Sequence, residues 1–271
     1  IIEACPTENK EKAMSLLHSF YCWGHVGVVL ISTAFFALFG TENWRVMALI
    51  WAILPVANLV LFAVAPIYAL GGDGEQNTGI GRLLRERLFW IFFLMMVAAG
   101  ASEQAVSQWA SAFAERGLGV GKAIGDLAGP MAFAFLMGLS RLIAGKYSER
   151  INTVTYMKYS ALLCIVSYIC IVFVPSPVVG LLGCAVCGFA VGMLWPGTYS
   201  MAAAGLRGGT PMFALLALGG DIGCAAGPTL AGLASSAAGD DLRSGIFAAI
   251  VFPVLMLAGI ILSTRRKAKI K

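Results

Sequence analysis

The chain consists mainly of long apolar segments, and these constrain its fold more than any single motif. Hydrophobic residues fill 59% of its 271 positions and charged residues 12%, whereas soluble domains average roughly 45–50% and about 25%. Each apolar segment is long enough for the about 20 residues that a membrane-crossing helix needs. No two-residue alternation typical of a transmembrane β-strand is present, so we predict an all-α membrane bundle. Eight segments are predicted to span, at 14–39, 46–69, 88–113, 123–144, 154–174, 178–203, 211–237 and 244–264.

Basic residues concentrate on one side of the predicted membrane. With the eight segments threaded alternately, fifteen of the nineteen Lys and Arg residues fall on one side, and only Arg45, Arg116, Lys122 and Arg243 fall on the other. Because cytoplasmic loops retain basic residues, we predict that both termini of the chain are cytoplasmic, in the plasma (inner) membrane of a bacterium. The net charge of +5 then requires no nucleic acid partner. The basic tail 265–271 is predicted to contact lipid headgroups of the bilayer.

Motifs for enzymatic or metal chemistry are missing from the sequence. It contains no G-x-S-x-G, H-E-x-x-H or P-loop pattern. Cys184 and Cys187 form a CxxC spacing, but no second Cys pair or His lies near them, so we interpret these residues as small packing groups. We therefore expect neither an enzyme nor a bound cofactor or metal.

Two short motifs repeat across the chain. WGHVG at 23–27 and GGDIG at 219–223 place His25 and Asp221 at equivalent positions, 196 residues apart. Each motif lies about eleven residues into a segment that enters from the cytoplasmic side, roughly 16 Å deep. Each segment is followed by a short loop that contains Arg. A repeat of this length predicts two structurally equivalent halves.

The stretch GLSRLIAGKYSER at 138–150 resembles the loop signature of the major facilitator superfamily of transporters. The matching positions are Gly145, Lys146, Glu149 and Arg150, with Glu149 where the family more often has Asp. The resemblance implies that Gly145 lets helices pack closely and that a carboxylate pairs with Arg. Together with Lys146, Arg141 is predicted to form ion pairs with Glu149 or with helices outside the chain, holding one conformation closed.

The same resemblance implies a domain organisation of two six-helix halves. On this match, segment 123–144 is helix 8, and the eight segments are helices 5 to 12 of twelve. The sequence begins Ile1-Ile2 rather than with Met, and we expect that helices 1 to 4 are missing from it. The expected parts are the last two helices of the first half (1–70), a cytoplasmic loop between halves (71–87), a six-helix second half (88–264) and the basic tail (265–271).

A stripe of small residues follows the segment that contains Asp221. Gly219, Gly223, Gly227, Ala231 and Ser235 recur every four residues, which lets a neighbouring helix approach closely. Asp221 lies about 200° around the helix from this stripe. We therefore expect its carboxylate to face a polar interior that it shares with His25.

Ionisable residues inside a membrane segment are functional candidates, because each costs about 2.5–3.5 kcal/mol on insertion scales. Asp221, Glu103 and His25 are candidates for carrying a coupling proton; the alternative for each is a buried packing residue with a local hydrogen bond. His18 shares a helix face with His25, and two histidines seven apart, without further ligands, do not predict a metal site.

A polar stripe with an aromatic neighbour predicts the solute site. Glu103, Gln104, Gln108 and Trp109 combine hydrogen-bonding groups with a ring, a pairing that suits a sugar-like ligand. The family resemblance implies that this segment lines the central cavity, and GASE…W is similar to sugar permeases related to the fucose permease. Trp195 and Tyr199 are candidates on the same ground, although packing is the slightly favoured explanation for them. Lys122 and Asp126 are expected to be solvated at the outer mouth.

We predict a secondary active transporter that takes up a small polar solute, such as a sugar, by alternating access with proton coupling or with another coupling ion. One alternative is an exporter of drugs or metabolites on the same fold. Another is a membrane scaffold or sensor that moves no solute.

Overall fold

The computed structural model describes residues 9–65 and 79–270 of the chain. The predicted parts that fall on 1–8, 66–78 and 271 lie outside the described residues. In order, the elements are α1 (Lys10–Phe39), η2 (Thr41–Asn43), α2 (Trp44–Val64), α3 (Ile80–Leu83), α4 (Arg87–Ser107), α5 (Ala110–Ala112), η3 (Phe113–Gly117), α6 (Lys122–Asp126), η4 (Leu127–Met131), α7 (Ala132–Lys146), α8 (Thr153–Phe173), α9 (Pro177–Val191), α10 (Leu194–Ala203), α11 (Gly209–Ala237), α12 (Leu242–Ala248) and α13 (Val251–Ile270).

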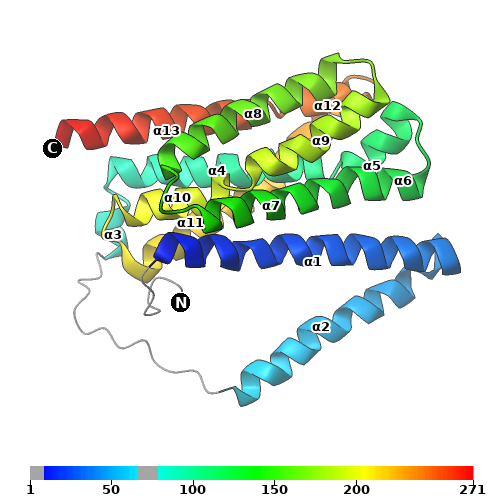
Figure 1. Cartoon of the computed structure of the whole chain (residues 1–271), viewed down its shortest axis with the longest axis horizontal. Helices are drawn as coiled ribbons and strands as arrows, with labels where there is room; N and C mark the ends of the chain where they lie inside the picture. The colour runs from blue at the N-terminus through cyan, green and yellow to red at the C-terminus, as the bar shows by residue number, and fades with distance from the viewer. Residues whose placement is uncertain (1–8, 66–78, 271) are drawn as a thin grey trace.

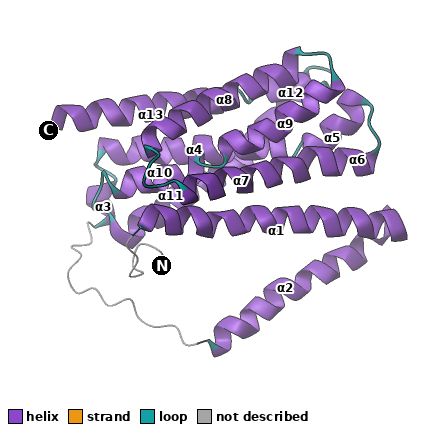
Figure 2. Ribbon diagram, in the orientation of Figure 1, coloured by secondary structure: helices purple, strands orange, loops and turns teal. Residues whose placement is uncertain are grey.

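These elements form long helical segments, with no strand in the ranges that the structure describes (Figure 2). Eight segments among the described residues are long and apolar enough to cross a membrane, which confirms the predicted all-α bundle. They run over Lys12–Phe39, Thr41–Val64, Arg87–Arg116, Lys122–Lys146, Thr153–Phe173, Pro177–Ala203, Gly209–Ala237 and Leu242–Arg265. Most predicted boundaries lie within three residues of these.

The six segments from α4 to α13 pack into one bundle, and α1 lies along α7 at the edge of that bundle (Figure 1). α2 turns back after η2 and diverges from the other helices (Figure 1). Its apolar side chains are largely uncovered; Leu49 is 70% exposed and Leu59 71%. The contact between α1 and α7 is therefore the place where the first two spans meet the other six.

The small-residue stripe of α11 packs against α4, as predicted. A Cβ atom on Gly223 would lie 2.0 Å from the Val97 carbonyl oxygen, and one on Gly227 would lie 2.4 Å from the Ala101 carbonyl oxygen. Since real Cβ atoms are not found so close to a backbone oxygen, only glycine permits this helix separation. Gly219 packs in the same way against the ring of Phe93.

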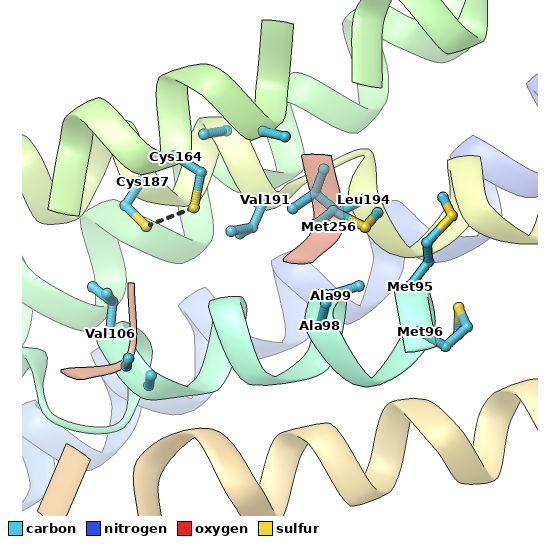
Figure 3. Close-up of a cluster of buried hydrophobic side chains, with 14 of the residues drawn as sticks. Met95, Met96, Ala98, Ala99, Val106, Cys164, Cys187, Val191, Leu194 and Met256 are labelled. Atoms are coloured by element: carbon cyan, nitrogen blue, oxygen red, sulfur yellow. Dashed lines mark hydrogen bonds between the residues drawn. The ribbon is translucent and has the colours of Figure 1, made fainter. Parts of the chain in front are cut away.

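The core of the bundle is apolar and rich in methionine and cysteine. Met95 and Met96 of α4 lie in it with Leu194 and Met256 (Figure 3). The sulfur atoms of Cys164 and Cys187 are 3.9 Å apart and both cysteines are free and buried. The packing role expected for the cysteines fits this position.

Three of the spans among the described residues are interrupted by short turns. The third span breaks at Gln108–Trp109, between α4 and α5, the sixth breaks at Gly192–Met193, between α9 and α10, and the eighth breaks at Ala249–Ile250, between α12 and α13. The elements η3 and η4 are π-helical turns that follow the first break and precede α7. Because each break frees backbone carbonyls from their helical partners, polar side chains can bind them inside the bundle.

Candidate functional site

The most heavily bonded polar side chain inside the bundle is Arg141 of α7, which is 2% exposed. Its Nε donates to the Gly192 carbonyl at 2.8 Å, at the break before α10. Its Nη1 donates to the His18 carbonyl of α1 at 2.7 Å and contacts the Cys22 sulfur at 3.2 Å. One guanidinium therefore binds carbonyls on both sides of the contact between α1 and the six-span bundle.

Glu103 of α4 is the charge partner of Arg141. Its Oε2 lies 3.5 Å from Arg141 Nη2, and the two side chains are 7% and 3% exposed. Gln104 Nε2 donates to Glu103 Oε1 and to the Tyr21 hydroxyl, each at 3.3 Å. The Arg141 guanidinium also lies over the Tyr21 ring, 5.8 Å from its centroid. A buried ion pair needs such additional bonds, since its desolvation offsets much of the charge attraction.

An aromatic group lies beside this ion pair. The His18 ring stacks on Tyr199 with centroids 6.0 Å apart, and Tyr199 also contacts Trp195 and Phe213. Trp195 covers Gly220 of α11, where an added Cβ would lie 2.1 Å from the ring. In this conformation Trp195 and Tyr199 pack against protein groups, and whether they also contact a solute stays a prediction.

Asp221 and His25 make no contact with each other among the described residues, and whether they share a polar interior stays a prediction. The side chain of Asp221 lies on the uncovered face of α11 and makes no hydrogen bond or ion pair with the described residues. His25 is half-buried, and its ring meets the ring of Tyr21, with centroids 6.2 Å apart. The matching depth of the two motifs therefore does not by itself bring the two side chains into contact.

The predicted solute stripe is divided by the helix break at Gln108–Trp109. Glu103 and Gln104 lie in the polar cluster on one side of it, and Gln108 is exposed. The Trp109 indole donates to the Pro228 carbonyl of α11 at 3.1 Å and packs over Gly232. Trp109 therefore joins α5 to α11, away from the polar groups with which it was grouped.

Of the two predicted partners of Arg141, Glu149 does not contact it, and contact with helices outside the chain stays a prediction. The ion pair with Glu149 that the loop signature suggested is absent among the described residues, because Arg141 lies five residues before the end of α7 and points into the bundle. Lys146, at the end of α7, is exposed, and so are Glu149 and Arg150 in the connection between α7 and α8. Gly145 does face α1, with an added Cβ at an ordinary 3.5 Å from Ser15 Cβ.

A second polar cluster joins the ends of the third and fourth spans. Lys122 Nζ lies 3.3 Å from Glu115 and 3.6 Å from Asp126, and Asp126 accepts a hydrogen bond from Ser111. Lys122 and Asp126 are therefore bonded to neighbouring groups rather than only solvated. The π-helical turns η3 and η4 carry or adjoin these residues and bring the two span ends together.

Three members of the main cluster were not predicted from the sequence. Tyr21 and Cys22 lie one helical turn from His18, and of these three residues only His18 was named from the sequence. An aromatic ring and a thiol in an apolar segment do not by themselves indicate a functional residue. Gly192 acts through its carbonyl, which no side-chain pattern reveals. Within the described ranges, no group of three or more His, Cys, Asp or Glu residues is arranged to hold a metal ion.

Eight membrane-length helical segments among the described residues, with an ion pair buried inside the bundle, define a multi-pass helical membrane protein. The profile of the Major Facilitator Superfamily matches residues 1–228, and the chain belongs to this family of membrane transporters. The family membership also agrees with the expectation that the chain is not an enzyme.

The fold is similar to that of a solved structure of the E. coli fucose:proton symporter, FucP. The TM-score is 0.64 at 15% identity, over 83% of this chain and 56% of that chain, so this chain spans little more than half of the symporter's length. No curated protein matches the sequence.

Proposed function

We propose that this protein is a secondary active transporter that takes up a small polar solute by proton symport. The observation that carries this proposal is the buried pair of Glu103 and Arg141. Arg141 is bonded at the same time to α1 and to the break before α10. A proton on Glu103 removes the negative charge opposite Arg141 and therefore weakens the attraction between the two side chains. Because Arg141 also binds α1 and the break before α10, proton binding is linked to the contact between α1 and the six-span bundle.

The proposed mechanism is alternating access. Residues 1–70 are the last two helices of one half, 71–87 the loop between halves, 88–264 the second half and 265–271 a basic tail. The two halves rock about a site near the midplane. Both termini of this chain face the cytoplasm, in the inner membrane of a bacterium, as the distribution of Lys and Arg favours.

For the solute we propose a sugar or a similar polyol. Gln104, Gln108 and the hydroxyl of Tyr199 offer hydrogen bonds, and Trp195 and Trp109 offer ring faces. A fucose:proton symporter among the structures of similar fold supports this class of solute and this coupling ion. Asp221 and His25 are further candidates for carrying the proton, and Arg141, Gly145, Lys146, Glu149 and Arg150 for controlling the conformational change.

The test is transport by the full-length protein in proteoliposomes with an imposed proton gradient, with labelled L-fucose as the first solute and other hexoses after it. Glu103→Gln is expected to abolish accumulation against a gradient while solute exchange continues, because exchange needs no net proton movement. Asp221→Asn is tested in the same way, and unchanged accumulation would remove Asp221 from the coupling role. Glu42→Gln, at an exposed carboxylate of η2, is the matched control.

The two alternatives give different results in this assay. Movement of a toxic compound out of cells, without sugar uptake, would indicate an exporter. Ligand binding without counterflow would indicate a scaffold or sensor. Accumulation that persists unchanged in Glu103→Gln would refute the proposed role of the ion pair.

A further inference from the structure

The two carboxylate oxygens of Glu103 have different partners. Oε2 lies 3.5 Å from Arg141 Nη2, inside the bundle. Oε1 accepts a hydrogen bond of 3.3 Å from the side-chain amide of Gln104, the next residue on α4. Consecutive side chains of a helix ordinarily point apart, so the Gln104 side chain bends back toward Glu103. One oxygen therefore faces the fixed charge of α7, and the other faces an amide that can rotate away.

The Gln104 amide has a second acceptor on the exposed side of this contact. Its Nε2 also donates to the Tyr21 hydroxyl of α1 at 3.3 Å; this second bond is exposed, whereas the bond to Glu103 is partly buried. The residues follow the same order, since Glu103 is 5% exposed, Gln104 is half-buried and Tyr21 is 51% exposed. Gln104 therefore lies between the buried carboxylate and the side from which a polar solute can approach.

Both bonds from Gln104 Nε2 are open to competition. Each is longer than the about 2.7–3.2 Å that is usual for an N–H···O bond. A solute hydroxyl beside Tyr21 offers the amide another acceptor at the same place. When the amide turns to the solute, the Glu103 carboxylate loses a hydrogen bond. Because a hydrogen bond to a carboxylate favours the charged form, losing this bond favours the protonated form.

We propose that Gln104 couples solute binding to proton binding, because its amide binds Glu103 Oε1 in the absence of solute and the solute in its presence. This inference rests on the proposed proton symport. As the solute takes the amide, a hydronium ion on the exposed side gives its proton to Glu103 Oε1 and becomes water. A protonated Glu103 is in turn a weaker acceptor and leaves the amide to the solute, so each ligand raises the affinity for the other. Glu103 carries the proton, and Gln104 is a positioning residue for it.

The other neighbours of Glu103 leave this role to Gln104. The titratable and charged groups that face Glu103 are Arg141 from α7, Tyr21 and Cys22 from α1, Cys187 from α9 and Cys224 from α11. Tyrosine and cysteine are ordinarily neutral near pH 7, so Arg141 is the one charged neighbour within the described ranges. Arg141 is 2% exposed and is bonded to two backbone carbonyls. A solute on the exposed side therefore meets the Gln104 amide before it meets the guanidinium.

Carbodiimide labelling of the full-length protein in nanodiscs tests the action of Gln104 on Glu103 without any solute. Dicyclohexylcarbodiimide reacts with protonated carboxyl groups in apolar surroundings, and peptide mass spectrometry measures the labelling rate of Glu103 over a pH series. Each rate is divided by the maximal rate of the same variant at low pH, so that a change in access alone has no effect.

At the pH where wild type reacts at about a tenth of its maximal rate, we expect Gln104→Met to react several-fold faster, because it lacks a hydrogen bond to the charged carboxylate. Methionine is also an unbranched, flexible side chain. Gln108→Met is the matched control, since Gln108 is exposed at the break that follows α4. This control is expected to follow the wild-type labelling curve.

Solute binding tests the coupling itself. Equilibrium binding of labelled L-fucose, and then of other hexoses, is measured over the same pH series. In wild type we expect the affinity to rise as the pH falls, because a proton on Glu103 releases the Gln104 amide. In Gln104→Met we expect weaker binding with little dependence on pH. A residue with a purely structural role would weaken binding by the same factor at every pH.

The outcomes separate this inference from the proposed function. A Gln104→Met labelling curve that matches the Gln108→Met curve would overturn the inference, even with proton-driven uptake intact. A shifted curve with an unchanged pH dependence of solute binding would overturn the coupling. If wild type binds no hexose or moves no protons, the proposed sugar:proton symport fails and the coupling fails with it, while the labelling still decides whether Gln104 acts on Glu103. If Gln104→Met does not fold, Tyr21→Phe removes the other polar group beside Glu103 and is expected to speed labelling in the same way.

Discussion

The contact between α4 and α11 is closest at Gly223, and a single methyl group there should separate the two helices. An ideal Cβ on Gly223 lies 2.0 Å from the carbonyl oxygen of Val97, 2.8 Å from its carbon and 2.9 Å from the amide nitrogen of Ala101. All three atoms are backbone, so no side chain can rotate away. Overpacking typically costs about 1–3 kcal/mol, and we expect Gly223→Ala to fall at the upper end of that range.

At roughly 2–4 °C per kcal/mol for a chain of this size, the expected loss in Tm is on the order of 5–10 °C. The assay is thermal unfolding of wild type and variant, purified in the same detergent. Gly81→Ala in α3 is the matched control, because no atom lies within 4 Å of its ideal Cβ. A Tm for Gly223→Ala equal to that of wild type or of the control would refute the argument that this glycine sets the helix separation.

Three other predictions test the site and its surroundings. The double variant Ser15→Cys, Gly145→Cys should form a disulfide between α1 and α7, since the two Cβ positions are 3.5 Å apart and disulfides need about 3.5–4.5 Å; transport should stop and return with reductant. Glu103→Gln should destabilise the fold by about 3–5 kcal/mol by removing the counter-charge of the buried Arg141 guanidinium, and adding Arg141→Met should recover part of this loss in a double-mutant cycle of unfolding free energies. Asp241→Ala should cost about 0.5–2 kcal/mol at pH 7, because Asp241 caps α12. Hydrogen bonds from the Ser244 hydroxyl, and then from backbone amides, lower the pKa of Asp241 below its usual 3.8, so this difference in stability should be present above that pH and disappear as the pH falls below it.

The helices were predictable because apolar length alone determines them. The span over Pro177–Ala203, for example, differs from the predicted 178–203 by one residue. The stripe from Gly219 to Ser235 was predictable for a related reason, since a spacing of four puts small residues on one helix face and the close approach follows.

The pairing of Glu103 with Arg141 could not be predicted in the same way. The two residues are on different spans, and their contact depends on how α4 and α7 are rotated in the bundle. The break at Gly192–Met193 also left no clear sequence signal, since Pro196, the nearest helix-breaking residue, lies in the first turn of α10, where proline is tolerated. The depth of Asp221 was inferred from its motif, whereas its exposure depends on which helices cover α11.

The interruption at Gly192 gives the sixth span a hinge. Gly192 donates its amide to Phe189, three residues back, at a long 3.3 Å, so the regular ladder is already broken at this point. Bending α10 relative to α9 therefore sacrifices little backbone bonding. The carbonyl of Gly192 accepts a 2.8 Å hydrogen bond from Arg141 Nε instead. A change that weakens this bond from the guanidinium would let α10 move independently of α9.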